Sequence, residues 1–240
     1  MGGWIGFIIL LILFPLTISK VLNRDNYTVI FYNGETLDEN RLRYFADNQY
    51  YREREYEFFT MYSFPTDIVF VGDSLTQRCQ WNELFPEYKV KNRGIGSDTT
   101  NGLLARLDSI IKTEPKILFV MIGINDIGLG IPEKETLNNI SAIIEKLKTS
   151  LPESYIYVQS ILPCGNEKGD LYNEVIQAYN KSIQQLVEGE RCYYVDLYSL
   201  FEDENGYLKD EYNYDNVHIT SSGYEIWYNK IYKICKGKLW

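Results

Sequence analysis

Two separate stretches of the chain hold residue types that together can perform nucleophilic catalysis. Ser74 stands in "GDSLTQ", directly after the apolar run "DIVFV". His218, the only histidine among the 240 residues, stands in "DNVHIT", three positions after Asp215. A serine hydroxyl becomes a nucleophile when a base lies within hydrogen-bond reach and a third group orients that base. His218 can be the base, and Asp215 can orient it because three residues lie within one turn of chain.

Two further stretches can supply donors for the negative oxygen that forms when a nucleophile attacks an acyl carbonyl. They are "NRGIGSDTT", residues 92–100, and "GINDIG", residues 123–128. Such an oxyanion is stabilised by hydrogen-bond donors that are fixed in advance. Backbone N–H groups in the glycine-rich turn at 94–97 and the side-chain amide of Asn125 are suitable donors.

Each stretch also has a simpler interpretation when it is taken alone. "GDS" can be a strand-to-helix turn, "GIGSDTT" a turn before a capped helix, and "GIND" a loop, while Asp215 and His218 can be a cap and a surface histidine. Neither G-x-x-x-x-G-K-[ST] nor G-x-G-x-x-G is present, so phosphate-binding loops are not indicated. A metal site would need further histidines, and we expect neither a metal nor an organic cofactor. The four stretches in this order favour an active site.

Five apolar runs alternate with helical patterns in the rest of the chain. The runs, which we expect to form strands, cover 67–71, 88–91, 116–122, 155–160 and 193–197. The helical patterns cover 76–84, 99–113, 133–149, 170–188 and 221–234. This alternation predicts an α/β fold, a three-layer α/β/α sandwich with a five-stranded parallel sheet, over residues 66–240. Because ligands bind beyond the carboxyl ends of parallel strands, the polar stretches should meet at one sheet edge.

The first 20 residues are different in kind. The run "WIGFIILLILFPLTI" has the length of a signal-peptide core or of a short membrane helix. We expect a hydrophobic N-terminal helix that anchors the protein in a membrane, with the domain on the extracytoplasmic side. Cleavage of a signal and secretion is the alternative. Lys20 and Arg24 follow the run and favour the cytoplasmic side, whereas the position of the segment at the N-terminus favours export.

Residues 21–65 are expected to form a linker and then a long helix. The helical pattern over 36–63 is dense in charges and aromatic residues and contains neither Gly nor Pro, and Pro65 follows it. We expect this helix to pack against the domain or to space it from the membrane.

The composition excludes some functions. The chain has 33 acidic and 24 basic residues, for a net charge of −9, which argues against nucleic acid as a partner. Its four cysteines form no C-x-x-C pair, so we expect four unpaired thiols and neither a zinc site nor a disulfide framework.

The chain resembles the SGNH, or GDSL-type, hydrolase family of serine esterases over roughly residues 66–236. "FVGDSLTQ", "NRGIGSDTT", "GIND" and "DNVHIT" stand in the order of the family's four sequence blocks. The resemblance implies a flavodoxin-like SGNH-hydrolase fold. It also implies a catalytic triad formed by Ser74, His218 and Asp215. It further implies an oxyanion hole formed by Ser74, Ser97 and Asn125. Asp73 resembles the structural aspartate of the first block.

The second block and "QSILP" (159–163) are similar to the branch that contains the α subunits of platelet-activating factor acetylhydrolase and bacterial lysophospholipase-like esterases. One position departs from the family, which usually has glycine where this chain has Ser97. The Ser97 N–H can still donate, but its side chain can narrow the acyl pocket, and its backbone must adopt angles that favour glycine.

The resemblance implies hydrolysis of carboxylic esters through an acyl-enzyme, with no cofactor. We expect a small-molecule or lipid ester as substrate, in first place a lipid or short-chain acyl ester. The alternatives are a carbohydrate O-acetyl esterase that acts on cell-envelope glycans, an acyltransferase that excludes water, and a non-enzymatic, membrane-tethered binding domain. The sequence leaves the oligomeric state open.

Overall fold

The computed structural model describes residues 22–24, 27–29, 49–187 and 189–238. The chain divides into two compact units, Met1–Asn48 and Gln49–Trp240. In the first unit, β1 (Leu22–Arg24) pairs antiparallel with β2 (Tyr27–Val29). The expected hydrophobic helix within residues 1–20 lies outside the described residues, as do positions 36–48 of the expected long helix.

The described helices can also be compared with the length of a membrane. None of the helices in the described ranges has the length and the apolar character that a membrane span requires.

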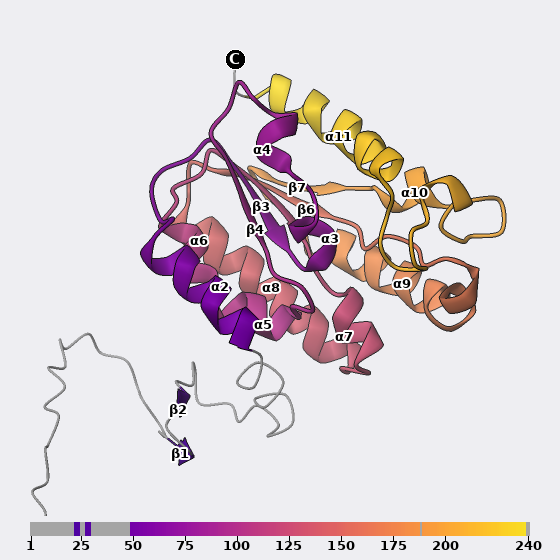
Figure 1. Ribbon diagram of the computed structural model, residues 1–240, viewed down its shortest axis with the longest axis horizontal. Coiled ribbons are helices and arrows are strands. Elements are labelled where there is room, and N and C mark those ends of the chain that lie inside the picture. The colour runs from indigo at the N-terminus through magenta and orange to yellow at the C-terminus, as the bar shows by residue number, and fades with distance from the viewer. Residues whose placement is uncertain (1–21, 25–26, 30–48, 188, 239–240) are drawn as a thin grey trace, which may run out of the picture. The chain divides into compact units, whose positions relative to one another are not determined.

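The second unit is built on a five-stranded parallel sheet, as the sequence predicts. Its strands are β3 (Ile68–Gly72), β4 (Val90–Gly94), β5 (Ile117–Met121), β6 (Tyr155–Gln159) and β7 (Cys192–Val195). They lie in the order β4-β3-β5-β6-β7, and every neighbouring pair is parallel (Figure 1). After β3 the chain forms β4 on one side of β3, and it then places β5, β6 and β7 one after another on the other side. The carboxyl ends of β3 and β5 therefore flank the switch point at which ligands bind in such sheets.

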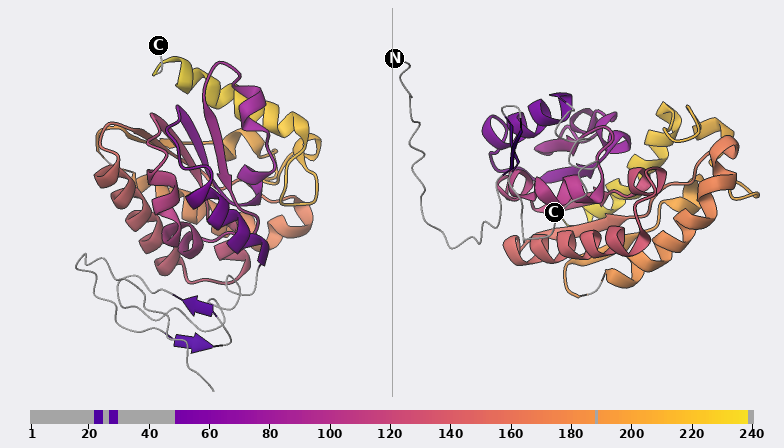
Figure 2. Two further views of the ribbon diagram at one scale, coloured as in Figure 1. Left: turned by 60° about the vertical axis from the view of Figure 1, so that its left-hand side comes forward. Right: turned by 90° about the horizontal axis from the view of Figure 1, so that it is seen from below.

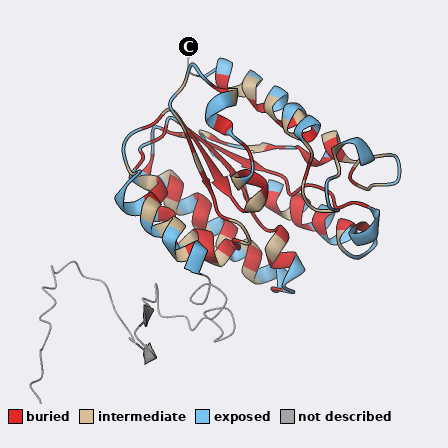
Figure 3. Ribbon diagram, viewed as in Figure 1, coloured by how far each residue is buried: buried red, intermediate tan, exposed pale blue. Residues whose placement is uncertain are grey.

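Helices cover both faces of the sheet (Figures 1 and 2). One face packs against α5 (Thr100–Ala105), α6 (Leu107–Ile111), α8 (Glu133–Ser150) and α9 (Asn166–Leu186). The other face packs against α4 (Trp81–Leu84) and α11 (Ser221–Lys236). All five residues of β3 are buried: Val69 and Val71 belong to the first core, and Ile68 and Phe70 to the second. Burial on both faces explains the continuous apolar runs in the sequence (Figure 3).

Several elements differ in their bounds from the sequence prediction. The expected helix 76–84 is two short helices, α3 (Ser74–Gln77) and α4, and the expected helix 99–113 divides at Arg106 into α5 and α6. The second strand is Val90–Gly94 and not 88–91. Arg106 ends α5 because its backbone has φ −101° and ψ 9° while its side chain reaches back to Gly72.

Three short helices are absent from the sequence prediction. They are α7 (Ile124–Gly128), α10 (Tyr198–Phe201) and the 3₁₀ turn η1 (Asp210–Tyr212). Elements of three to five residues are too short to show a helical repeat of apolar positions.

Helix α2 (Gln49–Thr60), in the part of the chain that we expect to precede the hydrolase domain, belongs to the second compact unit. It lies beside α6 (Figure 1). Two of its side chains, Tyr51 and Phe58, are buried. The guanidinium groups of Arg54 and Arg93 lie 4.6 and 4.4 Å from the centroid of the Phe58 ring. Aromatic and cationic contacts thus fix α2 to the domain.

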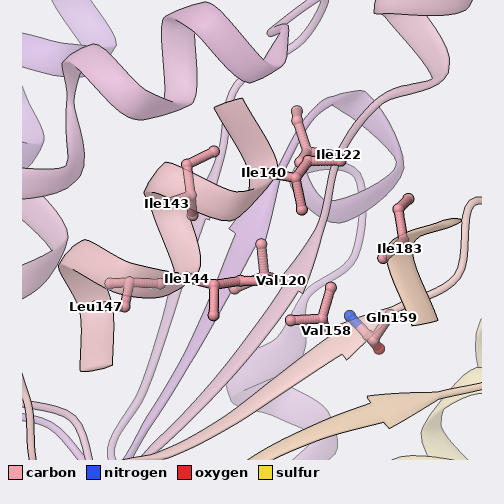
Figure 4. A pocket seen from close by; sticks show the side chains of 9 residues that line it. All are labelled: Val120, Ile122, Ile140, Ile143, Ile144, Leu147, Val158, Gln159 and Ile183. Carbon is pink, nitrogen blue, oxygen red and sulfur yellow. The ribbon is translucent and has the colours of Figure 1, made fainter. Parts of the chain in front are cut away.

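A cavity of about 10 Å³ lies in the first core, among nine side chains from β5, β6, α8, α9 and the residue after β5 (Figure 4). Eight of these side chains are apolar, and the ninth, Gln159, accepts a hydrogen bond from Trp227 Nε1 at 2.7 Å. This volume holds at most about one water molecule. The cavity is therefore a gap in packing and too small for a substrate.

Candidate active site

The structure brings together the three residues that the sequence predicts as a triad. Ser74 is the first residue of α3 and follows β3 after one connecting residue. Its Oγ lies 2.8 Å from Nε2 of His218, and His218 Nδ1 lies 2.7 Å from Oδ2 of Asp215. A carboxylate at Nδ1 holds the ring proton there, so that Nε2 presents a lone pair to Ser74. This is the arrangement that a general base for a serine nucleophile requires.

The turn that carries Asp215 and His218 is closed by hydrogen bonds from its backbone N–H groups to the Asp215 carboxylate. The N–H groups of Val217 and His218 donate to Asp215 Oδ1 at 3.2 and 2.8 Å. Burial disfavours the charged form of Asp215, but the His218 N–H, the His218 ring and the Val217 N–H together lower the pKa of Asp215 below its ordinary value. Asp215 is therefore ionised at neutral pH, as a group that orients an imidazole must be.

The loop after β4 passes close to Ser74. A Cβ placed on Gly96 would lie 4.0 Å from the Cβ of Ser74. A Cβ placed on Gly94 would lie 2.4 Å from the backbone nitrogen of Gln77, so only glycine allows β4 to approach α3 this closely. Ser97 has a φ of 64°, in the left-handed region that disfavours side chains. Ser97 thus keeps a glycine-like backbone at the position where the family usually has glycine.

Asn125 lies in the first turn of α7, after the carboxyl end of β5. Its Nδ2 donates to the backbone oxygen of Asp98 at 2.8 Å. An amide nitrogen carries two hydrogens, so Asn125 can hold Asp98 and donate to a substrate oxygen as well. The next residue, Asp126, accepts hydrogen bonds from the N–H and hydroxyl of Thr100 at 3.0 and 2.5 Å. These bonds fix the start of α5, which follows the loop after β4, to the first turn of α7.

A buried ion pair supports the loop from behind. Asp98 Oδ2 accepts hydrogen bonds from Nε and Nη2 of Arg106, both at 2.8 Å, and neither side chain is exposed. Arg106 Nη2 also donates to the backbone oxygen of Gly72 at 3.1 Å. Burial raises the pKa of Asp98 to about 6, and the charge of Arg106 opposes that rise. The pair links β3, the loop and α5.

Asp73 has a structural environment. Its Oδ1 accepts a hydrogen bond from the N–H of Leu75 at 2.9 Å and so caps α3. Its side chain is fully buried, and burial raises its pKa to about 7, with the nearby carboxylates Asp98 and Asp126 adding to the rise. In the structure Asp215, and not Asp73, contacts the histidine.

Sequence reasoning does not identify three further contributors to this site. Gln77 accepts a hydrogen bond from the N–H of Gly96 through Oε1. Arg106 pairs with Asp98, and the hydroxyl of Tyr51 donates to Asp98 Oδ1 at 3.1 Å. The sequence indicates a role for Gln77 only weakly, through its position as a polar residue about one helical turn after Ser74. It gives no indication for Tyr51, because the chain has 21 tyrosines and this one lies far from the motifs.

Comparison with known proteins places this arrangement in a family. The family described as GDSL-like Lipase/Acylhydrolase matches residues 70–226. Platelet-activating factor acetylhydrolase IB subunit alpha2 of Rattus norvegicus is 31% identical over 179 residues, 71% of this chain and 73% of the relative. Subunit alpha1 of the same enzyme from Pongo abelii is 30% identical over 165 residues, 66% of this chain and 70% of the relative.

Solved structures agree with the sequence relatives. A protein from Streptococcus pneumonia, described as a candidate platelet activating factor, is 28% identical with a TM-score of 0.71, and the match covers 82% of this chain and 97% of that one. The acetyl-xylooligosaccharide esterase Axe2 of Geobacillus Stearmophilus is 20% identical with a TM-score of 0.60, over 72% of this chain and 94% of that one. At that identity it shares the fold alone.

The matched segment contains every residue predicted for the triad and the oxyanion hole, from Ser74 to His218. The family match favours an enzyme over the non-enzymatic alternative, and the acetylhydrolase relatives, at 30–31% identity, agree with its reaction class. The protein is a hydrolase of ester bonds and belongs to the GDSL-like lipase/acylhydrolase family.

Proposed function

We propose that the protein hydrolyses short-chain acyl esters through an acyl-enzyme on Ser74. Acetyl esters of lipid-like alcohols are the first candidate substrates. The observation that carries this proposal is the continuous contact from Ser74 Oγ to His218 Nε2, at 2.8 Å, and from His218 Nδ1 to Asp215, at 2.7 Å. A nucleophile, a base and an orienting carboxylate in contact are what acyl transfer to serine requires.

The reaction proceeds in two halves. His218 Nε2 takes the hydroxyl proton of Ser74 while Oγ bonds to the acyl carbon, and the carbonyl oxygen becomes an oxyanion. The N–H groups of Ser74 and Ser97 and the Nδ2 of Asn125 stabilise that charge. When the intermediate collapses, the ester C–O bond breaks and His218 protonates the leaving alcohol. Water then repeats the sequence on the acyl-enzyme and releases the acid.

A short acyl group is supported by the position of Ser97. This residue carries a side chain on the oxyanion loop, at the place where the family usually has glycine, and its backbone lies in the left-handed region. A side chain there takes volume from the acyl pocket. The names of the acetylhydrolase relatives support the same acyl length and suggest a lipid-like alcohol.

A carbohydrate O-acetyl ester is the second candidate substrate. Tyr214, next to Asp215, is 69% exposed, and the guanidinium of Arg78 lies 5.7 Å from the centroid of its ring. The Tyr214 N–H donates to the backbone oxygen of His218 at 2.9 Å, so this exposed ring belongs to the turn that carries the histidine. Such a ring can stack against a sugar, because pyranose C–H groups pack well on aromatic faces.

A panel of esters distinguishes these candidates. It contains p-nitrophenyl acetate to palmitate, an acetylated lysophospholipid and acetylated oligosaccharides, with Ser74→Ala as the control. We expect acetate to be cleaved faster than palmitate and the acetylated lipid faster than the sugar. Preference for the sugar, with loss of that preference in Tyr214→Ala, would support the second candidate. An alcohol added as acceptor reveals an acyltransferase if it is esterified.

We also propose that residues 1–20 anchor the enzyme in a membrane, with the domain on the extracytoplasmic side. The apolar run that ends at Ile18 supports this location, and secretion after cleavage is the alternative. Cell fractionation should leave the enzyme with the membranes, and protease added to intact spheroplasts should digest it. Recovery of a shortened chain in the medium would indicate secretion, and protection from protease would place the domain in the cytoplasm.

A further inference from the structure

Helix α2 lies before residue 70, where the family match begins, and yet it contacts the loop that holds the proposed oxyanion donor Ser97. Two consecutive residues near the start of α2, Tyr50 and Tyr51, make these contacts. We propose that Tyr51, aided by Tyr50, is a positioning residue that holds the loop 95–98 in its catalytic conformation. The inference rests on the proposed function, because it assumes that the Ser97 N–H stabilises the oxyanion.

The contact from Tyr51 reaches the residue that follows Ser97. Tyr51 is 5% exposed, and its hydroxyl donates to Oδ1 of Asp98 at 3.1 Å. The other carboxylate oxygen binds Arg106, and the backbone oxygen of Asp98 accepts from Asn125. Asp98 is therefore the point at which the two predicted oxyanion donors, the Ser97 N–H and the Asn125 amide, are fixed relative to each other. Tyr51 therefore binds Oδ1 of Asp98, whereas Arg106 binds Oδ2.

The contact from Tyr50 reaches the residue that precedes Ser97. Gln77 Nε2 donates to the hydroxyl of Tyr50, and Gln77 Oε1 accepts from the N–H of Gly96. Gln77 is also the last residue of α3, the helix that begins with Ser74. Helix α2 thus holds the loop on both sides of Ser97, once through Gln77 and once through Asp98.

Ser97 needs such support because of its backbone conformation. Its φ of 64° is one that glycine adopts freely and serine does not. A residue in this region keeps its conformation only when its surroundings impose it. The hydrogen bonds at Gly96 and Asp98 help to impose it here, and at each residue one of these connections leads to α2. In a chain with glycine at this position, the loop would need less support.

A double-mutant cycle of Tyr51→Phe and Ser97→Gly tests this inference. Tyr51→Phe removes the hydroxyl and keeps the ring in its buried site. We expect kcat for p-nitrophenyl acetate to fall roughly 5- to 20-fold with KM within about two-fold, because misplaced oxyanion donors weaken the transition state and not substrate binding. When Ser97→Gly is already present, Tyr51→Phe should lower kcat less than about two-fold, because glycine reaches a φ of 64° without support.

Tyr56→Phe is the matched control, because Tyr56 is on the same helix, is 64% exposed, and makes no side-chain hydrogen bond to the loop 95–98 among the described residues. It should keep wild-type kcat. The inference is overturned if folded Tyr51→Phe keeps wild-type kcat, or if it lowers kcat by the same factor with and without Ser97→Gly, as a general loss of packing would. Should Tyr51→Phe fail to fold, Tyr50→Phe in the same cycle carries the test, with an expected loss of roughly 2- to 5-fold.

Failure of this inference is distinguishable from failure of the proposed function. Ser74→Ala tests the proposed function alone, since it removes the nucleophile and leaves α2 and the loop intact. If Ser74→Ala is inactive and Tyr51→Phe is fully active, only the role of α2 is wrong. If Ser74→Ala is active, the proposed reaction itself is wrong.

Discussion

The hydroxyl of Ser74 lies 2.8 Å from Nε2 of His218, although 144 positions separate the two residues in the chain. The parallel sheet produces this contact. Ser74 follows the carboxyl end of β3, the strand between β4 and β5, and His218 lies in the loop before α11, which packs on one face of the sheet. No local interaction could bring the two together.

Loss of the base should remove most of the activity. His218→Ala leaves Ser74 without a proton acceptor, because the chain contains no other histidine. We expect kcat to fall by at least about 10³-fold, and Asp215→Asn to lower it by about 10²-fold, since the ring then loses its orienting charge. Steady-state kinetics on p-nitrophenyl acetate measure both. Equal activity of His218→Ala and wild type would exclude the triad.

Loss of the amide donor should act on kcat. Asn125→Ala removes the Nδ2 group, which also holds the backbone oxygen of Asp98. We expect kcat to fall by about 10²- to 10³-fold with little change in KM, because the donor contacts charge that exists only in the transition state. Asn125→Asp, of the same size but without either N–H of the amide, should lose as much. A change confined to KM would argue for a role in substrate binding.

Relief of the left-handed backbone should stabilise the fold. Ser97→Gly is expected to raise the free energy of unfolding by roughly 0.5–1 kcal/mol, the cost of a side chain at positive φ less the extra chain entropy of glycine. Ser141→Gly is the matched control: Ser141 is exposed within α8, and glycine there should lower stability by about 0.5 kcal/mol. Urea denaturation measures both. A loss of stability in Ser97→Gly would show that the serine side chain makes a compensating contact.

Stability should depend on pH through Asp73. Burial raises its pKa from 3.8 to about 7, so between these values the folded chain holds a proton that the unfolded chain has released. The free energy of unfolding therefore falls as pH rises from 4 to 7, by at most about 4 kcal/mol for this group. Asp73→Asn removes the effect and should gain stability relative to wild type over this window. A difference that does not vary with pH would contradict the assignment.

Asp215→Asn is the internal control for that experiment, because folding shifts the pKa of Asp215 in the direction opposite to that of Asp73. The pKa of Asp215 is lowered in the folded chain, so its contribution is present above the ordinary carboxyl pKa and is lost as pH falls through the folded value. The variant should therefore be less stable than wild type near neutral pH, and the two should converge in acid.

The fold and the triad could be read from the sequence because both leave local signals. Continuous apolar runs mark buried parallel strands, and the blocks around Ser74, Asn125 and His218 follow the strands or precede the last helix. The division at Arg106 could not be predicted, because it coincides with a buried side chain that reaches the backbone oxygen of Gly72 at the end of β3. The short helix α7 could not be predicted for lack of a repeat.

The contacts of α2 with the site were also beyond the sequence. The pattern over 36–63 predicts a helix, and within the described residues the helix covers Gln49–Thr60 and ends three residues before the predicted bound. It does not show that Tyr51 meets Asp98, because that contact joins positions 47 residues apart through tertiary packing alone. Ser97 could be flagged as a departure from the family, but its left-handed backbone could only be seen in the structure.

The central claim is that Ser74 forms a covalent acyl intermediate with the help of His218. The most direct measurement is reaction of the full-length protein with a fluorophosphonate probe, followed by digestion and mass spectrometry of the labelled peptide. The account predicts a single adduct on Ser74, absent in Ser74→Ala and strongly slowed in His218→Ala. An adduct on a different residue, or ester hydrolysis by Ser74→Ala at the wild-type rate, would contradict it.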